Sequence, residues 1–184
     1  MTYLLLTVAL FGLAAAINTG SVALQQRTDW LGRRLGRRAW WVHLAVVTPG
    51  WAAFLYVQSQ LGHHLDWPLP RGLWPLGWAL LAVAVGLVAA SFLQLGPRRT
   101  FNGAFFDSGT ADAVSGATYR WLENPMYDGF WLSFVAIALI EANAAYLVLA
   151  AASYLLLNRF EARVENAPFA ARVRRARDRA EGEG

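Results

Sequence analysis

Long apolar runs alternate with short polar stretches along this chain, and this pattern predicts its elements. The runs are continuous, without the alternation of a half-buried strand, and several hold about 20 residues, enough for a helix to cross a bilayer. Because the bilayer core offers no water to the backbone, such segments are expected to be helices. We expect an all-α, polytopic integral membrane protein, one domain over residues 1–184, with about five membrane segments at about 2–24, 39–58, 74–95, 126–140 and 144–157.

The last apolar run, residues 126–157, is too long for one crossing. As a single helix its 32 residues would measure about 48 Å, against a hydrocarbon core of about 30 Å. Glu141, Ala142 and Asn143 interrupt the run near its middle, and a Glu at mid-bilayer is costly. We therefore predict a C-terminal helical hairpin that turns near 141–143. The arginine-rich tail 158–184 is expected to form a solvated helix on the membrane surface.

The basic residues are all arginine, and their distribution predicts the orientation. Five crossings bring the segments 25–38, 96–120 and 158–184 to one side, with fifteen of the sixteen arginines, and leave Arg71 opposite. By the positive-inside rule the arginine-rich side is cytoplasmic, and the N-terminus lies outside. The plasma membrane of a bacterium is the expected location, because the chain is rich in Ala and uses no Lys.

Composition narrows the classes of partner. The chain is 57% hydrophobic and 15% charged, whereas a soluble domain carries about 25% charged residues. Its net charge of +4 lies in arginine clusters beside apolar segments, which favours anionic lipid headgroups over nucleic acid. The absence of cysteine excludes disulfides and thiolate metal sites. The oligomeric state is left open by the sequence.

The stretch from Glu123 to Gly129 stands at the start of the last apolar run. Pro125 suits the first turn of a helix, where a missing N–H costs nothing. Asn124 is placed to cap that helix with its side-chain oxygen. The free N–H groups of a helix start favour an anion or a polar cofactor group. The simpler alternative is a capped membrane helix without a site.

Other polar residues near the apolar runs admit ordinary roles. Asn18 and Thr19 are expected to make hydrogen bonds between helices. His43 is a candidate proton acceptor, although a residue at the membrane interface is the commoner role. We predict a solvated loop at 63–66 and no metal site, since two adjacent His do not share a helix face and no third ligand is clear. The mixed segment 96–107 suits either a cofactor pocket or an ordinary interfacial loop.

Three blocks of residues follow one another in the second half of the chain. They are Ser91-Phe92 with Leu95-Gly96 and Thr100 to Phe106, then Glu123-Asn124-Pro125-Met126-Tyr127-Asp128-Gly129, then Glu165-Asn166-Ala167-Pro168-Phe169 with the segment to Arg172. In this order they resemble the phosphatidylethanolamine N-methyltransferase family. More broadly they are similar to the membrane methyltransferases that include the isoprenylcysteine carboxyl methyltransferases.

The resemblance implies methyl transfer from S-adenosylmethionine to phosphatidylethanolamine and to its mono- and dimethyl forms, toward phosphatidylcholine. An alkyl ammonium has a pKa near that of Lys, about 10.4, so it must lose a proton before it attacks. The resemblance also implies site residues. For the cofactor these are Gly96 and Gly103 for close backbone approach, Arg98 or Arg99 for a carboxylate or phosphate, Asn124, Pro125, Met126 and Tyr127 as a wall, and Glu165 with Asn166 for hydroxyls or an amino group. The candidates for handling the proton are Tyr127, Glu123 and Asp107.

Three other functions remain open at this stage. One is methyl transfer to a different acceptor, such as a prenylcysteine carboxylate or a small thiol. Another is a catalytically silent membrane scaffold. The third is a nicotinamide-dependent sterol reductase, which has a similar C-terminal architecture. Binding of S-adenosylmethionine, of a nicotinamide cofactor, or of neither separates them.

Overall fold

The structure is a computed structural model that describes residues 1–106 and 117–163. Its long helices are α1 (Thr2–Thr28), α3 (Ala39–Ser59), α5 (Trp74–Thr100), α6 (Pro125–Ile140) and α7 (Ala145–Ser153). The π-helical η5 (Tyr154–Glu161) continues α7. Short helices connect them: α2 (Trp30–Leu35), η1 (Gly36–Arg38), α4 (Leu61–His64), η2 (Arg71–Leu73), η3 (Gly103–Phe105) and η4 (Ala117–Arg120). Within the described ranges no strand is formed, and the predicted all-α class is confirmed.

Three helical segments are long and apolar enough to cross a membrane, as expected for a membrane protein. They are Thr2–Thr28, Ala39–Ser59 and Arg71–Thr100, whereas Pro125–Ile140 is shorter. Only 17% of the most apolar window of Ala39–Ser59, and of Arg71–Thr100, is buried inside the protein. These helices therefore turn much of their apolar surface outward, where lipid would cover it.

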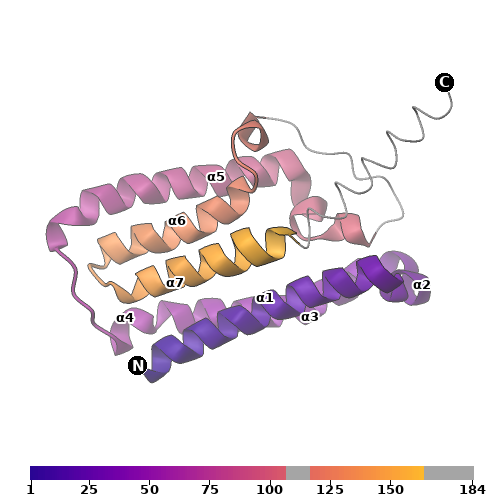
Figure 1. Cartoon of the computed structure of the whole chain (residues 1–184), viewed down its shortest axis with the longest axis horizontal. Helices are drawn as coiled ribbons and strands as arrows, with labels where there is room; N and C mark the ends of the chain where they lie inside the picture. The colour runs from indigo at the N-terminus through magenta and orange to yellow at the C-terminus, as the bar shows by residue number, and fades with distance from the viewer. Residues whose placement is uncertain (107–116, 164–184) are drawn as a thin grey trace.

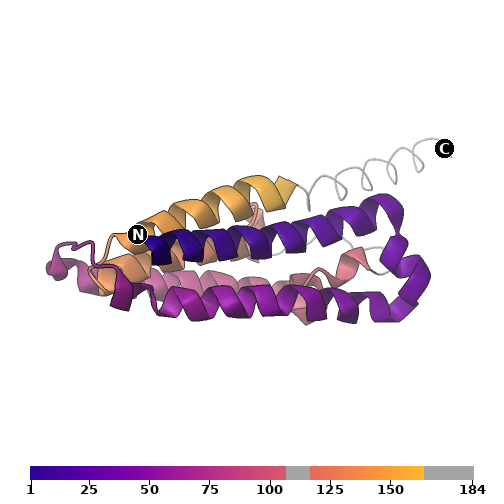
Figure 2. The same ribbon diagram turned by 90° about the horizontal axis from the view of Figure 1, so that it is seen from below.

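The helices run along one long axis (Figure 1). α1 packs against α3, while α6 packs against both α5 and α7. Figure 2 shows the turn from α1 into α3 through α2 at one end of the bundle. The core between the two groups is formed mainly by aromatic and branched side chains, among them Phe11, Phe54, Phe134, Leu149 and Leu157.

Two glycines bring α5 and α6 into close contact. A Cβ atom added at Gly129 would lie 2.7 Å from Val88 Cγ2 and 2.8 Å from the Ala84 carbonyl oxygen. At Gly77, an added Cβ would lie 2.9 Å from the Ala136 carbonyl oxygen. Small residues allow helix backbones to approach in this way. The glycine that ends the Glu123–Gly129 stretch thus serves helix packing.

The chain turns between α6 and α7 at residues 141–144. The buried Asn143 joins this turn to the segment before α5: its Nδ2 donates to the Leu65 carbonyl oxygen at 2.6 Å, and its Oδ1 accepts from Trp67 N at 3.3 Å and Ala145 N at 3.0 Å. Ala142 adopts a positive φ of 51°. The polar atoms that interrupt the last apolar run are therefore used to fix the turn.

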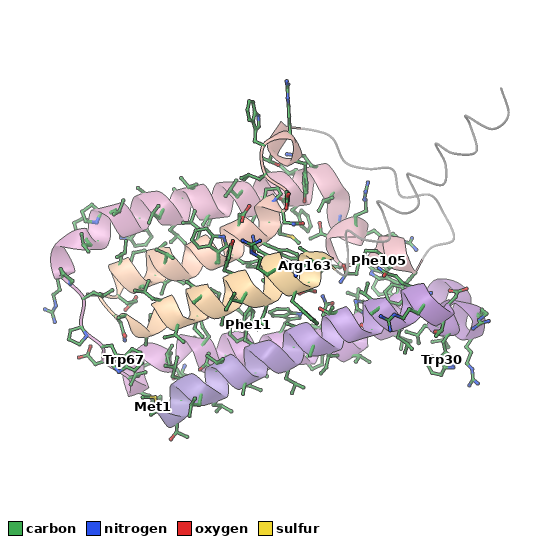
Figure 3. The ribbon with its side chains drawn as sticks, in the orientation of Figure 1. Met1, Phe11, Trp30, Trp67, Phe105 and Arg163 are labelled. Carbon is green, nitrogen blue, oxygen red and sulfur yellow. The ribbon has the colours of Figure 1, made fainter. Side chains whose placement is uncertain are left out.

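Arginines gather at one end of the bundle. α2, with Arg33 and Arg34, lies at the same end as the segment after Gly96, while η2, with Arg71, lies at the opposite end, where α5 begins (Figure 1). Figure 3 labels Trp30 at the first end and Trp67 near Met1 at the other. Trp30, Trp41 and Trp74 are exposed, as aromatic residues at membrane interfaces commonly are.

Candidate active site

A cavity of about 510 Å³ lies among α1, α3, α6, η5 and the segment that follows α5. Its walls are mostly apolar and aromatic, with contributions from Phe11, Trp51, Phe54, Phe130 and Phe134. The volume falls in the range of about 300–1,000 Å³ that is typical of small-molecule sites. Such a site needs a few polar groups to orient its ligand, and these are placed together.

Three polar side chains meet in the cavity wall from distant parts of the chain. Asn102 Nδ2 donates to Asn18 Oδ1 at 3.0 Å, and Asn18 Nδ2 donates to Glu161 Oε1. Glu161 is 1% exposed, and both Asn side chains are buried. Asn102 thus bonds to Asn18, and Asn18 bonds to the carboxylate. This Asn18–Asn102–Glu161 cluster gives the apolar cavity one polar end.

His43 lies beside this cluster and also lines the cavity. Ser21 Oγ donates to the Asn18 carbonyl oxygen at 2.8 Å and lies 2.9 Å from His43 Nδ1. The Phe106 ring packs on the imidazole, with 4.7 Å between ring centroids. His43 is only 2% exposed, so its ring is buried inside the bundle. The ring is enclosed because α1 and the segment after α5 close over the start of α3.

Ser153 adds a second kind of polar group to the cavity. It is fully buried, and within the described part of the chain its hydroxyl has no hydrogen-bond partner. Ser153, Leu157 and Glu161 follow one another at intervals of four and all line the cavity. A buried hydroxyl without a partner costs about 1–3 kcal/mol, which a bound ligand would offset.

Of the residues that the resemblance suggested, Met126 and Tyr127 line the cavity. Pro125 starts α6 and is buried, and Asn124 stands at the N-cap. The Asn124 side chain does not cap the helix, contrary to expectation; its carbonyl oxygen instead accepts from Asp128 N at 2.9 Å. Glu123 is exposed and does not line the cavity. The helix start therefore contributes its second and third residues to the site.

The glycine-bearing segment 96–106 lies next to the cavity. Four of its suggested site residues do not line the cavity: Gly96, Arg98, Arg99 and Gly103. Gly96 breaks α5 with a φ of 71°, and nothing lies within 4 Å of a Cβ placed there. A Cβ at Gly103 would lie 2.6 Å from the Arg98 carbonyl oxygen, so this glycine permits the loop to fold on itself. Thr100, Phe101 and Asn102 from the same segment do line the cavity.

The remaining suggested residues, Asp107, Glu165 and Asn166, lie outside the described residues. The first residues of the expected solvated tail, 158–163, are described: Glu161 and Ala162 are buried, whereas Arg159, Phe160 and Arg163 are exposed. Asn158 Nδ2 donates to Asp128 Oδ1 at 2.6 Å, which holds η5 against α6. This contact places Glu161 at the cavity.

The cavity has exposed lining residues on both α3 and α6. Leu55 on α3 and Phe130 on α6 both line it, yet they are 57% and 41% exposed. α3 packs mainly on α1, whereas α6 packs on α5 and α7, so the two rims belong to different helix groups. The rings of Phe54 and Phe134, 6.1 Å apart, connect the two groups deeper in the bundle. The opening is therefore lateral, on a face of apolar helices.

Sequence reasoning did not place Asn102 and Glu161 in the site. Glu161 carried a usable signal, because it continues a four-residue spacing from Ser153 and Leu157 along one helix face. The expectation that Asn18 bonds between helices is confirmed by its contact with Glu161. Thr19 behaves otherwise: within the described residues its buried hydroxyl has no partner.

Comparison with known proteins gives consistent matches. The sequence model of the phospholipid methyltransferase family matches residues 74–173, which is more than half of the chain. A phosphatidyl-N-methylethanolamine N-methyltransferase of Saccharomyces cerevisiae is 36% identical over 105 residues, which cover 57% of this chain and 50% of the yeast protein.

Two further relatives extend the comparison. A phosphatidylethanolamine N-methyltransferase of Homo sapiens is 34% identical over 103 residues, covering 54% of this chain and 49% of the human protein. A phosphatidyl-N-methylethanolamine N-methyltransferase of Neurospora crassa is 29% identical over 164 residues, covering 84% of this chain and 74% of the Neurospora crassa protein. The chain thus spans about half the length of the yeast and human relatives. No solved structure matches it significantly.

Proposed function

Because the chain belongs to the phospholipid methyltransferase family, we propose that it methylates the amine of phosphatidylethanolamine and of its mono- and dimethyl forms. The methyl donor is S-adenosylmethionine, and the product series leads toward phosphatidylcholine. The names of the yeast, human and Neurospora crassa relatives support this acceptor class.

The observation that carries the proposal is the cavity with one polar end. A phospholipid has an apolar body and a cationic amine head, and the cavity offers aromatic walls that lead to Glu161. The carboxylate attracts an ammonium group, and Asn18 and Asn102 hold the carboxylate in place. Enclosure by apolar walls strengthens this attraction and also favours the neutral amine that must attack.

The cavity wall fits the methyl donor as well. S-adenosylmethionine supplies an electrophilic methyl group on a sulfonium centre. Met126 and Tyr127 present a polarisable, aromatic wall at the start of α6, and the Ser153 hydroxyl lacks a partner within the described residues. Gly96 leaves open space at the backbone nearby. We assign the cofactor's polar groups to Arg98, Arg99 and the Glu165-Asn166 pair.

The position of each residue relative to the cavity also bears on the candidates for handling the proton. Tyr127 lines the cavity, whereas Glu123 is exposed at the surface. We therefore keep Tyr127 as a wall of the site and leave out Glu123.

The membrane arrangement follows the positive-inside rule. We propose five crossings, with α6 and the α7–η5 helix as a short hairpin, the N-terminus outside and the arginine-rich end cytoplasmic. The exposed rims Leu55 and Phe130 then face the acyl region of the bilayer. The lipid enters sideways, so its tails never leave the bilayer. The arginines of α2 lie at headgroup level, where anionic lipids would bind them.

An acceptor panel tests the proposed function. Purified protein would be placed in phosphatidylcholine bilayers that contain phosphatidylethanolamine, its monomethyl form, its dimethyl form, or none of these. Labelled S-adenosylmethionine would then be added, and the lipids resolved. Label in a methylated lipid supports the proposal and shows which steps the protein performs. Cofactor binding with unlabelled lipids would direct the search to prenylcysteine or thiol acceptors, and a protein that binds no S-adenosylmethionine would contradict methyl transfer.

A further inference from the structure

We infer that His43 accepts the proton that the lipid amine must lose before methyl transfer. The inference rests on the proposed function and adds a catalytic residue to it. It comes from the contacts of one imidazole ring in the cavity wall.

The contacts around His43 fit a neutral ring that carries its proton on Nδ1. Ser21 has a single hydroxyl proton, and its oxygen lies 2.8 Å from the Asn18 carbonyl oxygen and 2.9 Å from His43 Nδ1. We place the serine proton toward Asn18, because a carbonyl oxygen only accepts. With the proton there, the contact with the imidazole is a hydrogen bond when Nδ1 carries a proton and donates to Ser21. In the neutral ring this leaves Nε2 with its lone pair.

The ring borders the space in which the substrate would bind. Nδ1 faces Ser21 on α1, so Nε2 is the nitrogen turned away from that contact. The Phe106 ring packs on the imidazole, and Trp40 Nε1 donates to the Phe101 carbonyl oxygen at 2.9 Å, which ties the segment after α5 to the start of α3. His43 thus has a fixed orientation in the wall of the cavity.

His43 is also well placed relative to the carboxylate. Ser21 lies one helical turn after Asn18, and Asn18 donates to Glu161. The imidazole and the carboxylate therefore border the same end of the cavity, with Glu161 to hold the ammonium and His43 to take its proton. Among described residues, the other ionisable side chain lining the cavity is Tyr127, and Arg98 lies over Trp40 outside it.

The step is balanced as follows. An N–H bond of the lipid ammonium breaks, its electron pair stays on nitrogen, and the proton bonds to His43 Nε2. The nitrogen pair then forms the new N–C bond as the methyl–sulfur bond breaks, and that bonding pair remains on sulfur. The product is an N-methyl ammonium, and His43 releases its proton to water before the next turnover.

The first test measures the tautomer of His43 directly and needs no activity assay. The chain has three histidines, of which His63 and His64 are exposed, so nitrogen NMR of labelled histidine in micelles has few signals to assign. We expect a His43 signal of the Nδ1–H tautomer that is lost in Ser21→Ala. A His43 signal of the Nε2–H tautomer in the unmodified protein would overturn the inference.

The second test measures methyl transfer. We expect His43→Ala to lower kcat on phosphatidylethanolamine by about 100-fold or more, the usual contribution of a general base. S-adenosylmethionine binding should persist, and added imidazole should restore turnover in proportion to its concentration. His63→Ala, an exposed histidine, is the control and should keep full activity.

The outcomes separate the inference from the proposed function. Full activity of His43→Ala, or a loss that imidazole does not restore while the cofactor still binds, would overturn the role of His43 alone. An unmodified protein that labels no amine lipid would refute the proposed function together with the inference. If His43→Ala does not fold, the tautomer measurement and Ser21→Ala decide, because Ser21→Ala removes the anchor and keeps the imidazole.

Discussion

Asn18 and Glu161 are separated by 143 positions in the chain, and their side chains are hydrogen-bonded inside the bundle. This contact joins the first helix to the last described one and sets the polar end of the cavity. It also explains how an acidic side chain is kept at the end of an apolar helix: the Asn18 amide supplies a donor that water would otherwise provide.

The contact predicts energetic coupling between the two residues. Asn18→Ala and Glu161→Ala should each lower the free energy of unfolding, because each leaves a buried partner without its hydrogen bond. The loss in the double variant should be smaller than the sum of the two single losses by about 0.5–3 kcal/mol. Unfolding in mixed micelles measures the cycle. Thr7 on the same helix is the control: it is buried, and its hydroxyl donates to the nearby Tyr3 carbonyl oxygen. Thr7→Ala should be additive with Glu161→Ala. An additive Asn18–Glu161 pair would contradict the prediction.

Gly129 should tolerate no side chain. Gly129→Ala places a Cβ 2.8 Å from the Ala84 carbonyl oxygen, so α5 and α6 must separate at a cost of about 1–3 kcal/mol. Gly86→Ala on α5 is the matched control, because nothing lies within 4 Å of its added Cβ. Thermal unfolding in detergent should show a lower midpoint for Gly129→Ala than for Gly86→Ala. Equal midpoints would mean that the close helix contact does not exist.

The lateral opening predicts where a bulky group blocks the lipid. The chain has no cysteine, so a maleimide will react only at an introduced one. Attached to Leu55→Cys at the rim, it should raise the KM for phosphatidylethanolamine about fivefold or more, equivalent to about 1 kcal/mol. Binding of S-adenosylmethionine should change little.

Val46→Cys is the control for this blockade. Val46 is on the same helix and similarly exposed, 55% against 57% for Leu55, but it does not line the cavity. The same maleimide at Val46→Cys should leave the KM unaltered. Equal effects at both positions would argue against entry between α3 and α6.

The orientation is testable with two further cysteines. Leu35 ends α2 and Leu73 ends η2, two segments at opposite ends of the bundle, and the two residues are 39% and 38% exposed. In cells of a bacterial host, a membrane-impermeant maleimide should label Leu73→Cys from outside and reach Leu35→Cys only after the membrane is opened. The reverse pattern would invert the proposed topology.

Local sequence patterns predicted the helices well because lipid-facing helices are apolar on most sides. The breaks are also local: Gly96 needs a positive φ, and Asn143 is a short amide suited to fixing a turn. These features depend on residues close together in the chain. The all-α class could therefore be predicted from the sequence.

The polar end of the cavity could be predicted only in part. Met126 and Tyr127 belong to a recognisable stretch, and both line the cavity. Asn18, His43 and Glu161 come from three different helices, and no local pattern specifies which polar residue meets which. His43 illustrates this, because a histidine near a helix start is usually at the interface, and its burial depends on Ser21 and Phe106 packing over it. The sequence alone made it a candidate proton acceptor, and the tertiary arrangement places it in the cavity wall.

The most direct test compares the unmodified protein with Glu161→Gln in one assay, with labelled S-adenosylmethionine and bilayers of phosphatidylethanolamine. Loss of a charge-assisted contact of about 1.5–3 kcal/mol predicts a fall in kcat/KM of roughly 10- to 150-fold. Glu141→Gln, which changes an exposed carboxyl in the α6–α7 turn, should have no effect. We predict label in monomethylated lipid from the unmodified protein, strongly reduced in Glu161→Gln. Labelling that is absent from the unmodified protein, or equal in both, would contradict the assignment of the amine to the polar end of this cavity.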